Sequence, residues 1–172
     1  MSADFIISQI FAVPRERMFT LWTDVELLKQ WFGPAGVTVP QASMDLRPGG
    51  SFHFCMQSPD GTQMWGKWVF KEITPPGRLV WLHSFADEAG HPTRHPLSST
   101  WPLTLLSTVN FDDAQPGHTL VTVRWATHDA NPAEQATFDM SHPSMQMGWM
   151  GTFGRLQGFL AKANPTRPLA AL

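Results

Sequence analysis

The stretch that decides the fold is "MQMGWMGTFGRLQGFL", Met145 to Leu160, where large apolar residues at helical spacing are interrupted by glycines. At about 100° per residue, the bulky side chains fall on one arc of a helix: Met145, Trp149, Phe153, Leu156, Phe159 and Leu160. Each glycine inside a helix costs roughly 0.5–1 kcal/mol relative to alanine, whereas burying each large side chain contributes roughly 1.5–3 kcal/mol. Packing against a broad apolar partner is therefore predicted to stabilise a helix over about residues 142–163.

The glycines of this stretch form a second face of the predicted helix. Gly148, Gly151, Gly154 and Gly158 cluster opposite the bulky arc, beside Arg155 and Lys162. One interpretation, which we favour, is an outer surface that tolerates glycine. The other is a stripe without side chains that lets a neighbouring loop or a second subunit approach closely, which makes a homodimer possible.

Residues 37–127 supply the apolar partner, because strand-like runs alternate there with turn sequences. The turns are "RPGG", "SPDG", "TPPG" and "AQPG", whose composition is typical of tight connections between antiparallel strands. Phe52, Phe54 and Met56 share one face of their strand, since side chains alternate between the two faces. The region is predicted to form a meander of about six antiparallel strands with one apolar face.

Two short helices are predicted between the first strand and this meander. "FIISQIF", Phe5 to Phe11, is β-branched and aromatic and indicates a strand. The fixed φ angle of Pro14 suits the first turn of one helix, and apolar residues follow at helical spacing. Asp24 caps the second helix, which ends at Gly33 and Pro34.

A further short helix precedes the long one. In "NPAE", Asn131 is a cap with Glu134 three residues on, and Pro143 interrupts or restarts the helix. Together these elements predict an α+β fold in which an antiparallel sheet of about seven strands is covered by the long C-terminal helix.

Length and composition limit the domain count and the classes of partner. The 172 residues suit a single domain, 1–172, with a core over 5–162 and a C-terminal tail over 163–172. The net charge of −2 and the absence of a Lys/Arg run argue against a nucleic-acid partner. No apolar run reaches the roughly 18 residues of a membrane span, so no membrane partner is expected. The single cysteine, together with a start that lacks a basic segment and an unbroken apolar run, predicts a cytoplasmic protein.

The sequence offers little that is typical of catalysis. His91 and His95 have the spacing HxxxH, but in a Gly/Pro-containing loop this spacing fixes no common face, and no metal or other cofactor is expected. Cys55 alternates with apolar neighbours and is expected to face away from them as an inert thiol. His83 lies between large apolar residues in "VWLHSF", where it is either a general base or a hydrogen-bonded core residue.

Several motifs resemble one bacterial family. "WFGP" and "DLRPGG", with "PDGTQMWGKWVFKEITPPGRLVW" and "MGWMGTFGRLQGFLAK", are similar to the family related to the activator of heat-shock protein ATPase, within the START-like (SRPBCC) superfamily. The resemblance spans about Phe5 to Lys162. It implies the helix-grip fold, in which a curved antiparallel sheet wraps around the long C-terminal helix, a cavity lies between them, and the two short helices close one end.

The resemblance also implies a set of residues near that cavity: Trp31, Phe54, Met56, Trp68, Trp125, Met145, Trp149 and Phe153. For each of them plain core packing is the alternative. The loop "ADEAGHPTRHPLSSTWPL" is longer than a hairpin needs, and similar "TRHP…TWPL" stretches occur in a subset of the family. Arg94, His95 and Trp101 are therefore expected either to form a rim at the cavity mouth or, for Arg94, to pin the loop.

Three functions follow as hypotheses. The first is a domain, not demonstrably catalytic, that binds a small hydrophobic molecule, since Met and Trp suit an adaptable apolar pocket. The second is an enzyme of the cyclase or hydrolase kind found elsewhere in the superfamily, which needs His83, or Arg94 with His95, to point into the cavity. The third is a chaperone-activating module, which the family name suggests, although no extension is apparent that supplies a second contact surface.

Overall fold

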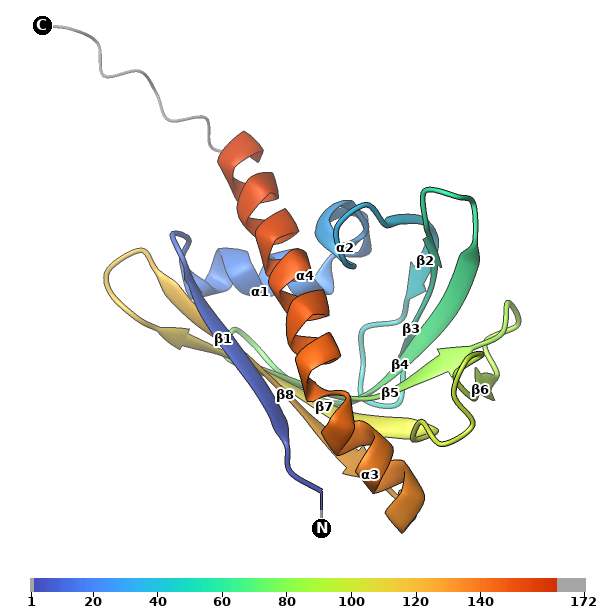
Figure 1. Cartoon of the computed structure of the whole chain (residues 1–172). Coiled ribbons are helices and arrows are strands. Elements are labelled where there is room, and N and C mark those ends of the chain that lie inside the picture. Colours follow the sequence, from blue (N-terminus) through green and yellow to red (C-terminus); the bar gives the residue numbers. More distant parts are fainter. Residues whose placement is uncertain (1, 164–172) are drawn as a thin grey trace, which may run out of the picture.

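A curved antiparallel sheet and one long helix make up most of the molecule (Figure 1). The structure is a computed structural model that describes residues 2–163, so the predicted tail beyond 163 lies outside the described residues. The strands are β1 (Phe5–Phe11), β2 (Thr38–Met44), β3 (Ser51–Gln57), β4 (Gln63–Thr74), β5 (Arg78–Ala86), β6 (Pro92–Thr93), β7 (Thr104–Asp113) and β8 (Thr119–His128). The helices are α1 (Arg15–Thr23), α2 (Val25–Trp31), α3 (Pro132–Met140) and α4 (His142–Ala163).

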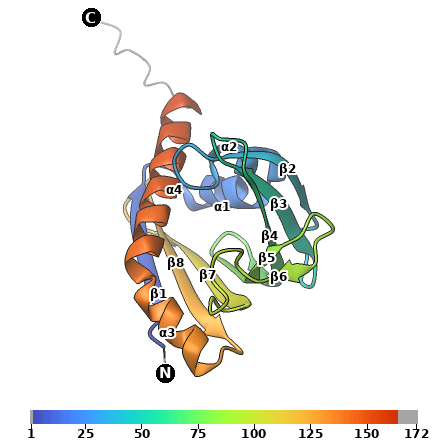
Figure 2. The ribbon, with the colours of Figure 1, turned by 45° about the vertical axis from the view of Figure 1, so that its right-hand side comes forward.

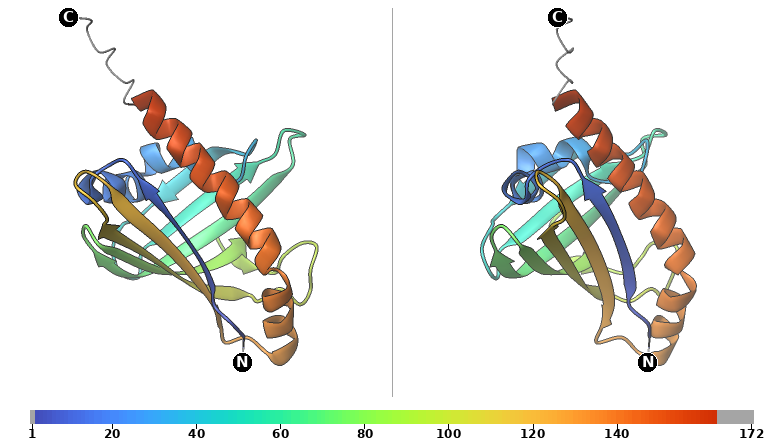
Figure 3. Two further views of the ribbon diagram at one scale, coloured as in Figure 1. Left: turned by 60° about the vertical axis from the view of Figure 1, so that its left-hand side comes forward. Right: turned by 90° about the vertical axis from the view of Figure 1, so that its left-hand side faces the viewer.

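The strand order confirms the predicted α+β architecture. The sheet runs β1-β8-β7-β5-β4-β3-β2, with every pairing antiparallel, and the two-residue β6 adds to β5. The path therefore has the seven strands expected, and β6 is an addition within the long loop before β7. The sheet bends so that β1 and β8 lie on one side of α4 and β2 to β4 on the other (Figures 1 and 3).

Helix α4 crosses the concave face of this sheet, as the spacing of its bulky residues predicted (Figure 3). Trp149 is 6% exposed and Phe153 is 1% exposed, and Met145 and Leu156 are also buried. Phe153 packs edge-on against Phe11 of β1, with ring centroids 5.5 Å apart. Side-chain burial against the sheet therefore offsets the glycine cost in this helix. None of the helices within residues 2–163 is both long and apolar enough to cross a membrane.

The two short helices close one end of the sheet (Figure 2). As predicted, Asp24 caps α2, because its side chain accepts hydrogen bonds from the backbone N–H groups of Glu26 and Leu27. Trp22 of α1 is fully buried, and its ring contacts Trp31 of α2 and stacks against Trp149 of α4. A capping box also starts α3 as expected.

The glycine face of α4 divides into three environments. Among residues 2–163, a Cβ added at Gly154 or Gly158 would meet nothing within 4 Å, which agrees with the outer-surface interpretation there. At Gly151 an added Cβ would lie 3.3 Å from the backbone nitrogen of Ala35, so a neighbouring loop does approach this position closely. Gly148 lines a cavity between α4 and the sheet. The expectation that all four glycines form a tolerated outer surface is therefore wrong for Gly148 and Gly151.

Candidate functional site

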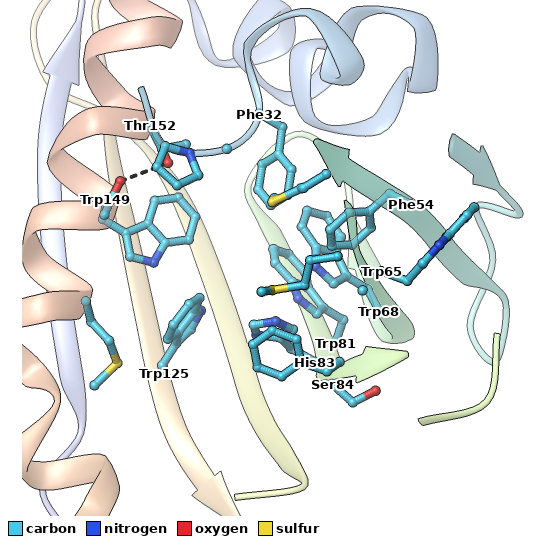
Figure 4. A pocket seen from close by; sticks show the side chains of 18 residues that line it. Phe32, Phe54, Trp65, Trp68, Trp81, His83, Ser84, Trp125, Trp149 and Thr152 are labelled. Carbon is cyan, nitrogen blue, oxygen red and sulfur yellow. Dashed lines mark hydrogen bonds between the residues drawn. The ribbon is translucent and has the colours of Figure 1, made fainter. Parts of the chain in front are cut away.

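A cavity of about 270 Å³ lies between α4 and the inner face of the sheet (Figure 4). Strands β3, β4, β5 and β8 form one wall, and α4 forms the opposite wall with Trp149 and Thr152. The segment Phe32–Pro34, which follows α2, lies at one end. An engineered apolar cavity of about 150 Å³ holds benzene, so this one is large enough for roughly ten non-hydrogen atoms.

The structure brings together seven of the residues predicted to lie near this space. Those that line the cavity are Phe54, Met56, Trp68, His83, Trp125, Met145 and Trp149. They come from four strands and one helix, so the sheet curvature and the placement of α4 are what assemble them.

Trp31 and Phe153 do not line the cavity, and the expectation that they lie beside it is wrong. Trp31 is fully buried behind Trp22, and its Nε1–H donates to the carbonyl of Leu21 at 3.0 Å. The ring of Phe153 packs against Phe11 of β1 and against Trp149, with centroids 5.5 Å apart in both cases. Both residues belong to the core that holds the helices on the sheet.

The long loop residues also lie outside the cavity lining. Arg94 donates through Nη1 to the buried carboxylate of Glu134 and to the carbonyl of Trp101 at 3.3 Å. The pKa of Glu134 is lowered, first by its hydrogen bond from the backbone of Asn131 and then by Arg94. Arg94 therefore pins the loop onto α3, and does not form a rim at the cavity mouth.

His95 and Trp101 form a second layer behind the cavity wall. The His95 ring packs edge-on against Phe85, which does line the cavity, with centroids 4.7 Å apart. Trp101 contacts His95 and Phe138 of α3. Burial lowers the pKa of His95, and its Nδ1 accepts the backbone N–H of Leu97 at 2.9 Å. These side chains support Phe85 from behind.

Eleven of the 18 residues that line the cavity were missed by the sequence reasoning, and three of them are informative. Trp81 stands two positions before His83 on β5, so strand alternation places it on the same face, and this signal was available. Gly66 pairs with Phe54, and a Cβ added there would lie 2.5 Å from the Phe54 ring, so glycine makes room for that ring. Gly148 is one helical turn from Met145 and Thr152, which also face the cavity.

Stacked and edge-on aromatic rings form the wall of the cavity. Trp68 and Trp81 stack with centroids 4.0 Å apart and an interplanar angle of 16°. Trp125 meets Trp149 of α4 edge-on at 5.7 Å, and His83 lies 5.0 Å from Trp125. Such rings present broad apolar surface with few polar atoms, and they lose little conformational freedom when a ligand packs on them.

His83 is the one ionisable side chain among the residues that line the cavity. Its Nδ1 is buried and has no hydrogen-bond partner in the part of the chain that the structure describes. Burial lowers the pKa of His83 to about 4, because the charged imidazolium loses its hydration. His83 is therefore a neutral imidazole at pH 7.

One end of the cavity is held in place by a cation on α4. Arg155 donates through Nη1 to the carbonyl of Phe32 at 2.9 Å and to that of Gly33 at 3.2 Å. Burial lowers the pKa of Arg155, but a guanidinium remains charged at neutral pH. These bonds fix Phe32, whose ring packs edge-on against Phe54 and Trp68.

The cavity wall is largely apolar, and among the described residues that line it His83 is the one side chain that could act as an acid or a base. Within residues 2–163, no three His, Cys, Asp or Glu side chains are grouped so that they could hold a metal ion. Cys55 is buried on the same strand as Phe54 but is absent from the cavity lining, and burial raises the pKa of its thiol. A raised pKa leaves the thiol protonated and unreactive.

Comparison with solved structures gives the same fold. A protein from Arthrobacter aurescens is 25% identical with a TM-score of 0.75, covering 99% of this chain and 94% of that one. Protein NE0264 from Nitrosomonas europaea is 25% identical with a TM-score of 0.71, over 94% and 96% of the two chains. Protein Ms6760 from Mycobacterium smegmatis is 24% identical with a TM-score of 0.72, over 92% and 91%.

Sequence comparison agrees with the motifs and with the fold. No curated protein sequence matches the chain. The family model for Activator of Hsp90 ATPase homolog 1-like protein matches residues 12–161, which include every element from α1 to α3 and all of α4 except its last two residues. The chain therefore belongs to the Activator of Hsp90 ATPase homolog 1-like family, with the START-like, helix-grip fold.

Proposed function

We propose that this domain binds a small, mostly hydrophobic molecule in the cavity between α4 and the sheet. The observation that supports the proposal is the cavity itself, about 270 Å³ of space surrounded by Trp, Phe and Met side chains. Burying roughly 250 Å² of apolar ligand surface at about 25 cal/mol per Å² contributes about 6 kcal/mol. After part of this is lost to immobilisation, dissociation constants of about 0.1 to a few millimolar are expected for such small ligands.

Filling the cavity from α4 tests this function. In a Gly148→Leu variant, the new side chain enters the cavity without removing any residue that lines it, because nothing lies within 4 Å of a Cβ at this position. We expect the affinity for small aromatic probes to fall at least about tenfold. The fold is expected to remain stable, since leucine is the better helix former. Titration calorimetry and urea unfolding would measure the two effects.

Gly154→Leu is the matched control, because Gly154 lies on the same helix with open space around it. This variant should bind the probes as the wild type does. Equal affinity in Gly148→Leu and in wild type would place any bound probe elsewhere and would contradict the proposed function.

A second function, acid–base catalysis on a bound molecule, is favoured by the position of His83 in the cavity wall. A neutral imidazole is available as a base, although a pKa of about 4 makes it a weak one. If it acts, hydrolysis of a small activated ester such as 4-nitrophenyl acetate should rise with pH up to about 5 and then level off. A His83→Phe variant with the same rate and pH profile would exclude this role. Since no second acid or base is found among the described residues that line the cavity, binding is the better supported function.

A further inference from the structure

A second pocket, of about 250 Å³, lies against the outer face of β2, β3 and β4, under the turn between β5 and β6. Most of its lining side chains are polar, in contrast to those of the cavity beside α4. The residues that line it are Gln41, Ala42, Ser43, His53, Trp65 and Glu88. The proposed function uses none of their polar groups, although Trp65 also borders the cavity.

The strand register explains why these side chains meet on the outer face. Ser43 of β2 pairs with His53 of β3, and two positions away Gln41 and Trp65 pair with Cys55 from either side. Directly paired residues share a face, and successive residues of a strand alternate between faces. Figure 4 shows the Trp65 side chain directed away from the cavity. Its ring stacks on that of His53, with centroids 4.7 Å apart and an interplanar angle of 24°.

The turn between β5 and β6 forms the remaining wall, and two hydrogen bonds hold it on the sheet. His53 donates through Nε2 to the carbonyl of Asp87 at 3.0 Å, and Lys67 donates through Nζ to the carbonyl of Gly90 at 2.9 Å. Glu88 follows the first of these anchored residues and lines the pocket. The turn therefore holds a carboxylate beside the His53 and Trp65 rings.

The carboxylate of Glu88 has no ion-pair partner among the described residues. Burial raises the pKa of the Cys55 thiol, and the charge of Glu88 raises it further, so this charge acts on the floor of the pocket. The Lys67 ammonium donates to the turn and does not neutralise Glu88. The pocket thus carries an uncompensated negative charge.

The other groups of the pocket are suited to a donor. A carbonyl only accepts hydrogen bonds, so the Nε2 atom of His53 that faces Asp87 carries the hydrogen, and Nδ1 of the neutral ring is left as an acceptor. A carboxylate also only accepts. The face of an indole ring such as that of Trp65 attracts positive charge. A ligand that complements this set has N–H donors and a positive charge.

We propose that this pocket binds a small organic cation of the guanidinium class, held by Glu88, His53 and Trp65. A planar guanidinium donates two parallel hydrogen bonds to a carboxylate, and its remaining N–H groups are available to a second acceptor. Gln41 and Ser43 contribute further polar groups on the β2 side. The site is separate from the proposed function, since the cavity lies on the opposite face of the same strands.

Two probes of the same planar shape and the same number of non-hydrogen atoms test the charge requirement. Ethylguanidinium carries the cation, and N-ethylurea is its neutral counterpart. Each is titrated into the ¹⁵N-labelled full-length protein, and the indole N–H signal of Trp65 is followed after assignment with a Trp65→Phe variant. We expect a dissociation constant of about 10 mM for ethylguanidinium and binding at least about fivefold weaker for N-ethylurea.

Three variants locate the site. Glu88→Gln removes the charge at an exposed position with little change of size, so it should keep the fold and reduce the affinity for ethylguanidinium about fivefold. Glu16→Gln is the matched control, because Glu16 is an exposed carboxylate on α1, and it should bind as the wild type does. Gly148→Leu, which fills the cavity, should also leave ethylguanidinium binding unchanged.

The contrary results are distinct from those that test the cavity. Equal affinity for the two probes, or unchanged affinity in Glu88→Gln, would overturn this inference and leave the proposed function intact. Weaker ethylguanidinium binding in Gly148→Leu would place the cation in the cavity and would overturn it as well. So would the absence of binding up to about 100 mM, which is well above the expected dissociation constant.

Discussion

Replacing Phe153 with alanine is expected to lower the free energy of unfolding by about 3–5 kcal/mol, which is the usual range for deleting a buried phenylalanine. Phe153 is 1% exposed and sits between Phe11 of β1 and Trp149 of its own helix, with ring centroids 5.5 Å away in both cases. Its loss removes these contacts and leaves a space that the rigid sheet cannot collapse to fill. Urea unfolding followed by tryptophan fluorescence would measure the change.

Met150→Ala is the matched control on the same helix. Met150 is 60% exposed, so its truncation should change stability by no more than about 0.5 kcal/mol. A loss below about 1 kcal/mol for Phe153→Ala would mean that burial of the apolar face does not hold α4 on the sheet.

The second large effect is a dependence of stability on pH that originates at His83. Its pKa in the folded protein is about 4, whereas an unperturbed histidine titrates near 6.5. Between these values the unfolded chain binds a proton that the folded protein excludes, so stability falls as the pH is lowered through this window. The loss from His83 should reach about 2–3 kcal/mol between pH 7 and pH 4.5 and should level off below pH 4.

A His83→Phe variant tests the origin of this effect. Carboxylates also titrate as the pH falls, so the informative quantity is the difference between wild type and variant. The variant should lose about 2–3 kcal/mol less stability over the same interval. His118→Gln, at the turn before β8, is the control for replacing a histidine and should lose as much stability as wild type over this interval. Parallel curves for wild type and His83→Phe would mean that His83 is not neutralised by burial.

Local chemistry made much of the fold predictable. Asp24 and Asn131 cap their helices as expected, because capping depends on residues within one turn of each other. The range of α4 followed from the spacing of its bulky side chains, since a helix that places them on one arc must bury that arc. Strand alternation likewise put Phe54, Trp68 and their neighbours inside.

The cavity lining was only partly predictable, because it depends on how distant elements meet. Trp31 and Trp68 have equally apolar surroundings in the sequence, yet Trp31 packs behind Trp22 while Trp68 faces the cavity. Which of them borders the cavity depends on the strand register and on the bend of the sheet. Neither property can be recognised from the neighbouring residues in the sequence. Gly148 was assigned to the outer face because the helix was divided by residue size alone, with the bulky residues on one face and the glycines on the other. The role of Arg94 required the position of Glu134, 40 residues away in the chain.

The two walls of the cavity differ in how they are joined to the rest of the molecule. The strands are linked by continuous ladders of backbone hydrogen bonds, whereas within residues 2–163 no backbone hydrogen bond joins α4 to the sheet. The strands are therefore held to one another by main-chain hydrogen bonds, whereas α4 is held by side-chain contacts, among them those of Arg155 with Phe32 and Gly33, and can slide or tilt by exchanging such contacts. Larger ligands would therefore be accommodated more readily by movement of α4 than by separation of the strands.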